Sequence, residues 1–132
     1  MPKPIIICVD DETLVLDSLK IELKKFFNNS CLYEFASSGE EGLEIVADVD
    51  QEAPDSKKVV ISDWWMPSMK GDEFLTAVHQ KYPQITTIML TGQASEAAIA
   101  DVKEKANLYR CIRKPWLHDE LMHTIKQVIQ LN

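Results

Sequence analysis

Short apolar runs alternate with longer segments of mixed polarity along the whole chain. The apolar runs predict five strands, at residues 5–9, 32–36, 59–62, 85–90 and 108–113. Apolar residues at helical spacing predict four helices, at residues 13–27, 71–82, 95–106 and 117–131. A further helix is expected to begin near Glu40, where two adjacent glutamates suit the positive end of a helix dipole. The pattern therefore alternates strand and helix five times.

The same spacing predicts which side of each helix is buried. The first helix should bury Leu16, Leu19, Leu23 and Phe26. The second should bury Leu43, Val46 and Ala47, and the last should bury Leu117, Leu121, Ile125 and Val128. The helix at residues 95–106 has a thin apolar side, so we expect it to be weakly held. Residues 48–58 are polar and include Pro54, which favours an exposed loop.

Strict strand–helix alternation is typical of a parallel sheet with helices on both faces. The run at residues 5–9 is apolar at every position, as expected for a strand covered on both sides. The runs at residues 32–36 and 108–113 are mixed in polarity and are predicted at the sheet edges. Because no linker or repeat interrupts the pattern, residues 1–132 are predicted to form a single domain.

Composition narrows the possible function classes. The 132 residues are 45% hydrophobic and 27% charged, which is typical of a soluble globular protein. A net charge of −7 argues against direct binding to nucleic acid or to an anionic membrane. Cys8, Cys31 and Cys111 form no CxxC pair, so neither a zinc site nor a disulfide framework is indicated. The N-terminal apolar run is too short for a signal peptide or a membrane span, and we expect a cytoplasmic protein.

Reactive side chains follow four of the five predicted strands. These residues are Asp10 and Asp11, Asp63, Thr91 and Lys114. In a parallel sheet the carboxyl ends of the strands meet at one edge, where open α/β sheets bind ligands. Each residue alone has an ordinary explanation as a helix cap, a turn residue or a surface lysine. Their coincidence at one edge predicts a shared site.

The five groups could together hold a divalent metal and a phosphoryl group. Adjacent carboxylates repel each other and need a cation, and oxygen ligands suit Mg²⁺. The carboxylate of Asp63 could attack phosphorus and form an acyl phosphate. The hydroxyl of Thr91 and the ammonium of Lys114 could neutralise the phosphoryl oxygens.

The strings VDDE, SDWWMP, LTG and KPW, in this order and spacing, resemble the receiver domain of two-component response regulators. The resemblance covers residues 5–129. It implies a flavodoxin-like three-layer α/β/α fold, with five parallel strands in the order 2-1-3-4-5 and five helices. It also implies a signalling module rather than an enzyme, with at most self-phosphorylation from small phosphodonors and slow autodephosphorylation.

The resemblance assigns roles to the residues of the predicted site. Asp63 would be the phosphoacceptor. Asp63 would also be a ligand of Mg²⁺, together with Asp11, which would bind it directly, Asp10, which would bind it through water, and the backbone carbonyl of Trp65.

The remaining implied roles concern the phosphoryl group and the partners. Thr91 and Lys114 would contact the phosphoryl oxygens, and the peptide bond before Pro115 would be cis. A sensor histidine kinase or a histidine phosphotransfer protein would supply the phosphoryl group. The phosphorylated domain would then act on a downstream protein target or on a fused output domain, without contacting nucleic acid or membrane.

Three positions depart from the family pattern or tune it. Cys111 stands three residues before Lys114, where receivers usually carry an aromatic ring, so we expect the signal to travel instead through the predicted fourth helix and the loop before it. Trp65 and Gln93 occupy positions that influence how water reaches the acyl phosphate. A bulky indole at residue 65 could prolong the life of the phosphate, or it could lie on the surface without effect.

Three alternative functions fit the sequence less well. A receiver-like interaction domain could work without phosphorylation, for which Cys111 is a mild argument. A flavodoxin-like cofactor carrier would require hydroxyls and glycines after the first strand. The string VDDETL instead places carboxylates there, and these repel phosphate. An aspartyl-phosphate hydrolase would require a DxD pattern after a strand, and neither DDE nor SDWW supplies it.

Overall fold

The computed structural model describes residues 2–92 and 94–130. Within them, five parallel strands form one sheet in the order β2-β1-β3-β4-β5. The strands are β1 (Ile5–Val9), β2 (Leu32–Ala36), β3 (Lys58–Asp63), β4 (Thr86–Thr91) and β5 (Arg110–Arg113). The α-helices are α1 (Thr13–Phe27), α2 (Gly39–Glu52), α3 (Gly71–Lys81), α4 (Glu96–Ala106) and α5 (His118–Gln130). The predicted fold class, strand order and five helices are confirmed.

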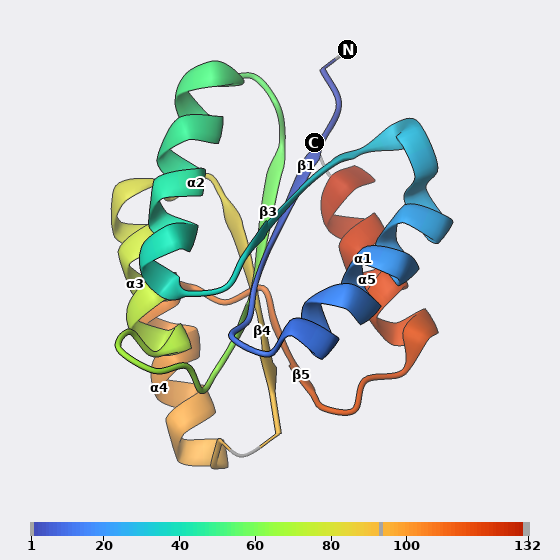
Figure 1. The fold of residues 1–132 in the computed structure, drawn as a ribbon. Helices are drawn as coiled ribbons and strands as arrows, with labels where there is room; N and C mark the ends of the chain where they lie inside the picture. Colours follow the sequence, from blue (N-terminus) through green and yellow to red (C-terminus); the bar gives the residue numbers. More distant parts are fainter. Residues whose placement is uncertain (1, 93, 131–132) are drawn as a thin grey trace.

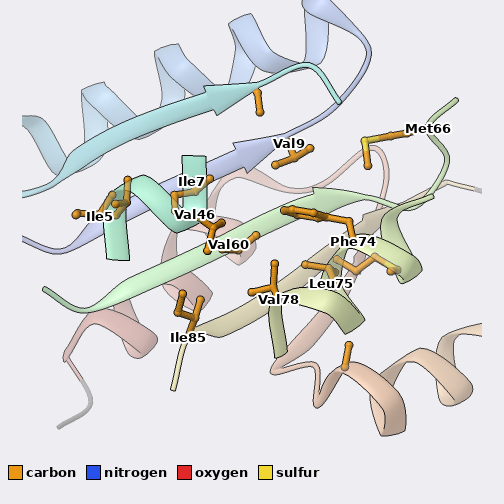
Figure 2. Packing of buried hydrophobic residues seen from close by; sticks show 14 of the residues in the cluster. Ile5, Ile7, Val9, Val46, Val60, Met66, Phe74, Leu75, Val78 and Ile85 are labelled. Atoms are coloured by element: carbon orange, nitrogen blue, oxygen red, sulfur yellow. The ribbon is translucent and has the colours of Figure 1, made fainter. Parts of the chain in front are cut away.

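The helices cover the sheet as two layers. Helices α2, α3 and α4 lie on one face, and α1 and α5 lie on the other (Figure 1). Alternate residues of a strand point to opposite faces, so β1 divides its side chains between two cores. Ile5, Ile7 and Val9 join the core under α2 and α3, which Figure 2 shows together with Val60 and Phe74. The other residues of β1 join the core beneath α1 and α5.

Burial separates the central strands from the edge strands. Every residue of β1 and β3 is buried, whereas β2 and β5 each contain a single buried residue, Ala36 and Ile112, among half-buried and exposed ones. The predicted edge positions of β2 and β5 are therefore confirmed. Among the described residues, no helix combines the length and the apolar character needed to cross a bilayer.

The register brings the carboxyl ends of four strands together. Val9 of β1 pairs with Ser62 of β3, so the residues that follow them are neighbours. On the other side of β3, Asp63 pairs with Leu90, and Thr91 pairs with Arg113 of β5. The polar residues that close the apolar runs consequently lie along one edge of the sheet.

The loop predicted at residues 48–58 is wrong over its first part, because α2 continues to Glu52. Val49 is buried one turn beyond Val46, so the apolar side of α2 extends through a sequence that reads as polar. Gly42, rather than Leu43 or Ala47, lies at the buried centre of this helix face.

Two predicted core residues also lie at the surface. Phe26 is 39% exposed, and Phe27 takes the buried position at the end of α1. The ring of Phe26 instead packs edge-on against Phe27 and His118. Leu117 is 73% exposed because α5 begins one residue later, at His118.

Candidate functional site

Asp10 turns inward directly after β1. Its side chain is 1% exposed, and its Oδ1 accepts a hydrogen bond from the backbone N–H of Glu12 at 2.9 Å. Its own N–H donates to the carbonyl of Ala36 at 3.1 Å. These two bonds fix the turn between β1 and α1, while the neighbouring Asp11 remains exposed. The acidic pair therefore combines one buried carboxylate with one that faces solvent.

Asp63 is the last residue of β3 and is 6% exposed. The backbone N–H of Gly71, at the start of α3, donates to the carbonyl of Trp64 at 2.8 Å. A Cβ at residue 71 would overlap the carbonyl oxygen of Asp63, so only glycine permits this approach. Gly71 therefore allows the backbone to pass close to Asp63, a role that was not predicted from the sequence. A glycine opening a predicted helix close after the acid was the available signal.

Lys114 joins the two buried acids. Its Nζ lies 3.0 Å from Oδ2 of Asp10 and 2.9 Å from Oδ1 of Asp63. Its backbone N–H donates to the carbonyl of Thr91 at 2.8 Å, which fixes the end of β5 beside β4. The peptide bond between Lys114 and Pro115 is cis.

The segment after Lys114 is anchored to α1. The indole N–H of Trp116 donates to Oε2 of Glu22 at 3.2 Å, and Nδ1 of His118 lies 2.7 Å from Oε1 of the same carboxylate. One acidic side chain of α1 therefore holds two of the three residues that follow Pro115, Trp116 and His118. This role of Glu22 could not be predicted from the sequence, because the contact spans more than 90 residues of chain.

The charges of the site do not balance. Burial raises the pKa of both Asp10 and Asp63, and Lys114 opposes this rise in each case. Burial alone would lower the pKa of Lys114, but its bonds to Asp63 and Asp10 outweigh that effect and raise the pKa. One ammonium thus faces three carboxylates, since Asp11 also contributes negative charge. The cluster favours a further cation.

The acidic cluster has suitable ligands for that cation. One carboxylate oxygen from each of Asp10, Asp11 and Asp63 lies within 4.8 Å of the other two. A set of hard oxygen donors fits Mg²⁺, which needs few protein ligands because it keeps several waters. The residues present therefore fit the metal expected from the sequence.

Thr91 and the two neighbouring tryptophans complete a small pocket. Thr91 is fully buried, and its Oγ1 accepts a hydrogen bond from the backbone N–H of Ala94 at 3.0 Å. The pocket has a volume of about 150 Å³ and is lined by Asp11, Glu12, Asp63, Trp64, Trp65, Thr91, Gly92 and Lys114. A pocket of this size with an acid, a hydroxyl and an ammonium could receive one phosphoryl group.

Trp65 borders the pocket without being buried. It is 58% exposed, and Nζ of Lys70 lies 5.0 Å from its ring centroid. Gln93, the second residue expected to tune the site, lies outside the described residues.

Cys111 lies away from the pocket lining, in the middle of β5. It pairs with Met89 of β4, and its partly buried free thiol packs against the core beneath α2 and α3. Burial raises the pKa of this thiol. A different contact links β5 to the loop after Thr91, because the guanidinium of Arg113 donates to the carbonyl of Ala94 at 3.3 Å.

Comparisons with known proteins agree with this geometry. The family model of the response regulator receiver domain matches residues 6–126. The chain is 34% identical over 126 residues to the hydrogenase transcriptional regulatory protein HoxA of Cupriavidus necator, a match that covers 95% of this chain and 24% of that protein. It is 27% identical to the chemotaxis protein CheY1 of Helicobacter pylori, over 96% of this chain and 98% of that protein.

Solved structures give the same result. The signal receiver domain of an HD domain-containing protein from Pseudomonas fluorescens superposes with a TM-score of 0.85 and 29% identity, covering 98% of this chain and 96% of that chain. The chain spans about a quarter of the length of the HoxA regulator.

Proposed function

The chain belongs to the response regulator receiver domain family, and on this premise we propose that it is a switch set by phosphorylation of Asp63. The observation that carries the proposal is the position of Lys114, whose Nζ bridges the carboxylates of Asp10 and Asp63 at 3.0 and 2.9 Å. Such an ammonium can transfer its bonds to an incoming phosphoryl group without leaving the site. The receiver family itself consists of signalling domains rather than metabolic enzymes.

Mg²⁺ is the proposed cofactor. Asp11 and Asp63 would bind it directly, Asp10 would bind it through water, and the backbone carbonyl of Trp65 would provide the remaining protein ligand. When bound, the ion would neutralise negative charge on the phosphoryl oxygens.

The residues of the chain would share the remaining work of phosphoryl transfer. An oxygen of Asp63 forms the new bond to phosphorus as the bond to the donor breaks, and the electron pair of that bond leaves with the donor. Nζ of Lys114 exchanges its present bond to Oδ1 of Asp63 for a bond to a phosphoryl oxygen. Thr91 donates its hydroxyl hydrogen to another phosphoryl oxygen, and this change alters the bond that its Oγ1 now accepts from Ala94.

We propose that phosphorylation changes the conformation of the loop before α4. Cys111 supplies no aromatic ring at the position where most receivers carry one, so the signal needs this other route. The backbone carbonyl of Ala94 accepts a hydrogen bond from Arg113, and the backbone N–H of Ala94 donates one to Thr91. A movement of Thr91 would therefore be transmitted to β5 through one residue. Helix α4 can follow, because its only buried residues are Val102 and Ala106.

The proposed partners follow from the family. A sensor histidine kinase or a histidine phosphotransfer protein would donate the phosphoryl group. The receiver would act on a separate protein, or on an output domain in the same chain, as the greater lengths of the HoxA regulator and the sensor kinase CckA of Brucella abortus suggest. The three free cysteines fit a reducing cytoplasmic setting.

Incubation with Mg²⁺ and acetyl phosphate tests the proposal. Intact mass should rise by one phosphoryl group in the parent protein and should stay unchanged in Asp63→Asn. Omission of Mg²⁺ should slow the reaction strongly, because the three carboxylates then repel the donor. A parent protein that gains no mass under these conditions would instead support a receiver-like domain that works without phosphorylation.

A further inference from the structure

A second cavity lies where β1 and β2 begin, at the opposite end of the sheet from Asp63. The last turn of α1 and the short 3₁₀ helix Asn28–Ser30 border it, and both lie at this end of the molecule (Figure 1). Its volume is about 600 Å³, which is within the range of sites that bind small molecules. The residues that line it take no part in the proposed phosphorylation.

The lining of this cavity is positively charged at neutral pH. Lys3 and Lys24 supply two ammonium groups, and neither forms an ion pair with a carboxylate of the described residues. None of the described residues in the lining is acidic. Burial raises the pKa of the Cys31 thiol, and it raises the pKa of Tyr33 to about 12, so both groups stay neutral. A chain with a net charge of −7 therefore has a local site that suits an anion.

The negative end of α1 opposes an anion here less than usual, because its carbonyl groups are already bonded. The backbone N–H of Asn28 donates to the carbonyl of Lys24. The hydroxyl of Tyr33 donates to the carbonyl of Asn28 at 2.8 Å and to that of Leu23 at 3.3 Å. These bonds satisfy groups that a helix otherwise leaves unpaired at its C-terminus.

Asn28 has a backbone conformation that favours glycine, with φ at 51° and ψ at −129°. Side chains are strained at a positive φ, and strained residues gather at binding sites. Glycine would relieve this strain, but it would leave no side-chain amide at residue 28. Asn28 and Asn29 bring two amide groups to the lining. Such groups can both donate hydrogen bonds to the edge of a heterocyclic base and accept them from it.

We propose that this cavity binds a nucleoside monophosphate. A phosphate monoester carries nearly two negative charges at neutral pH, which matches the ammonium groups of Lys3 and Lys24. Leu32, which is 50% exposed, provides an apolar surface for the flat base. The side-chain amide of asparagine matches the edge of adenine, so adenosine 5′-monophosphate (AMP) is the best-suited probe. This site is separate from the phosphorylation of Asp63 and goes beyond it.

Titration of the ¹⁵N-labelled protein with AMP tests the proposal by nuclear magnetic resonance. Without Mg²⁺, the backbone amide signals of Lys24, Asn28 and Tyr33 should shift progressively, whereas those of Asp10 and Asp63 should not. Adenosine lacks the charged group, and inorganic phosphate lacks the base. Each should therefore bind at least about tenfold more weakly than AMP.

Two substitutions on α1 separate a built site from general charge attraction. Lys24→Gln should weaken AMP binding roughly fivefold, because one of the two ammonium groups is lost. Lys25→Gln is the matched control, since Lys25 is also exposed and lies in the same last turn of α1 but outside the lining. It should change the affinity by less than about twofold.

Asn28→Gly distinguishes binding from stability. It should weaken AMP binding roughly threefold, because an amide is lost from the lining. The midpoint of urea unfolding should not fall, since glycine adopts a positive φ without strain.

Four results would overturn the proposal. Signals at the cavity could stay unchanged, or the shifts could gather around Asp63 instead. Equal losses in Lys24→Gln and Lys25→Gln would show that AMP is attracted only by general positive charge. Adenosine or inorganic phosphate that bound as tightly as AMP would exclude a nucleotide site. The proposed phosphorylation, measured by intact mass, does not depend on any of these results.

Discussion

Two largely buried lysines lie at opposite ends of the sheet, and their partners differ in kind. Lys58 opens β3 and is 4% exposed. Its Nζ donates to the backbone carbonyls of Ala53 at 2.7 Å and Ser56 at 3.1 Å, and Asp50 lies 3.6 Å away. Lys58 therefore satisfies carbonyl groups just beyond the C-terminus of α2.

Lys114 follows β5, at the edge where the strands end. Its bonds go to the side chains of Asp10 and Asp63 instead of to the backbone. A backbone carbonyl keeps its position and its charge as long as the fold persists. A carboxylate can instead bind another cation or gain a phosphoryl group. The partners of a buried ammonium therefore distinguish a structural lysine from one that can change its bonds.

Lys114→Met should have the larger effect on phosphorylation. The rate of phosphoryl transfer from acetyl phosphate should fall on the order of 100-fold, because a preformed charge opposite the phosphoryl oxygens is lost. At neutral pH without Mg²⁺, the free energy of unfolding should also fall by about 2 kcal/mol, since Asp10 and Asp63 lose their cation. Urea unfolding with and without Mg²⁺ checks this, and added Mg²⁺ should restore much of the loss. An unchanged rate would mean that Lys114 takes no part in phosphoryl transfer.

Lys58→Met should lower stability and leave phosphorylation intact. We expect a loss of about 2 kcal/mol in the free energy of unfolding, because the carbonyls of Ala53 and Ser56 lose a charged donor. Urea unfolding measures the loss, and Mg²⁺ should not restore it. Lys57→Met, at the adjacent position, is the matched control and should unfold like the parent. If Mg²⁺ rescued Lys58→Met as well, the contrast between the two lysines would not hold.

Trp65→Asn should have a smaller effect, on the life of the phosphate. Replacement of the exposed indole should open the pocket to water and speed autodephosphorylation several-fold, on the order of 1 kcal/mol in the barrier. Loss of the phosphoryl mass after removal of the donor gives the rate. An unchanged rate would mean that the indole does not shield the acyl phosphate.

Much of the candidate site could be predicted because its residues lie where the predicted strands end. Asp63 follows three buried aliphatic residues and a serine, and Lys114 follows a strand of mixed polarity. A parallel sheet places all such strand ends at one edge, so local patterns suffice to group them. The roles of these residues in phosphorylation remain proposals.

Features that depend on how the elements pack could not be predicted from the sequence. Lys58 reads as part of a polar loop, yet it is buried against the end of α2. The burial of Phe27 in place of Phe26 depends on how the last turn of α1 meets the rest of the core. Gly71 and Glu22 acquire their roles only when α3 and α1 are packed beside the site.

The strand–helix alternation and the polar residues at the strand ends follow from the sequence alone, since hydrophobic periodicity and chain order are local properties. The bonding partners of those residues depend on the tertiary structure. It placed Lys114 between two acids 104 and 51 residues earlier in the chain, and it turned Lys58 toward carbonyls. The physical reason is that a buried charge is costly unless it is paired with the polar atoms that packing brings near it. Local residue spacing does not determine which atoms those are.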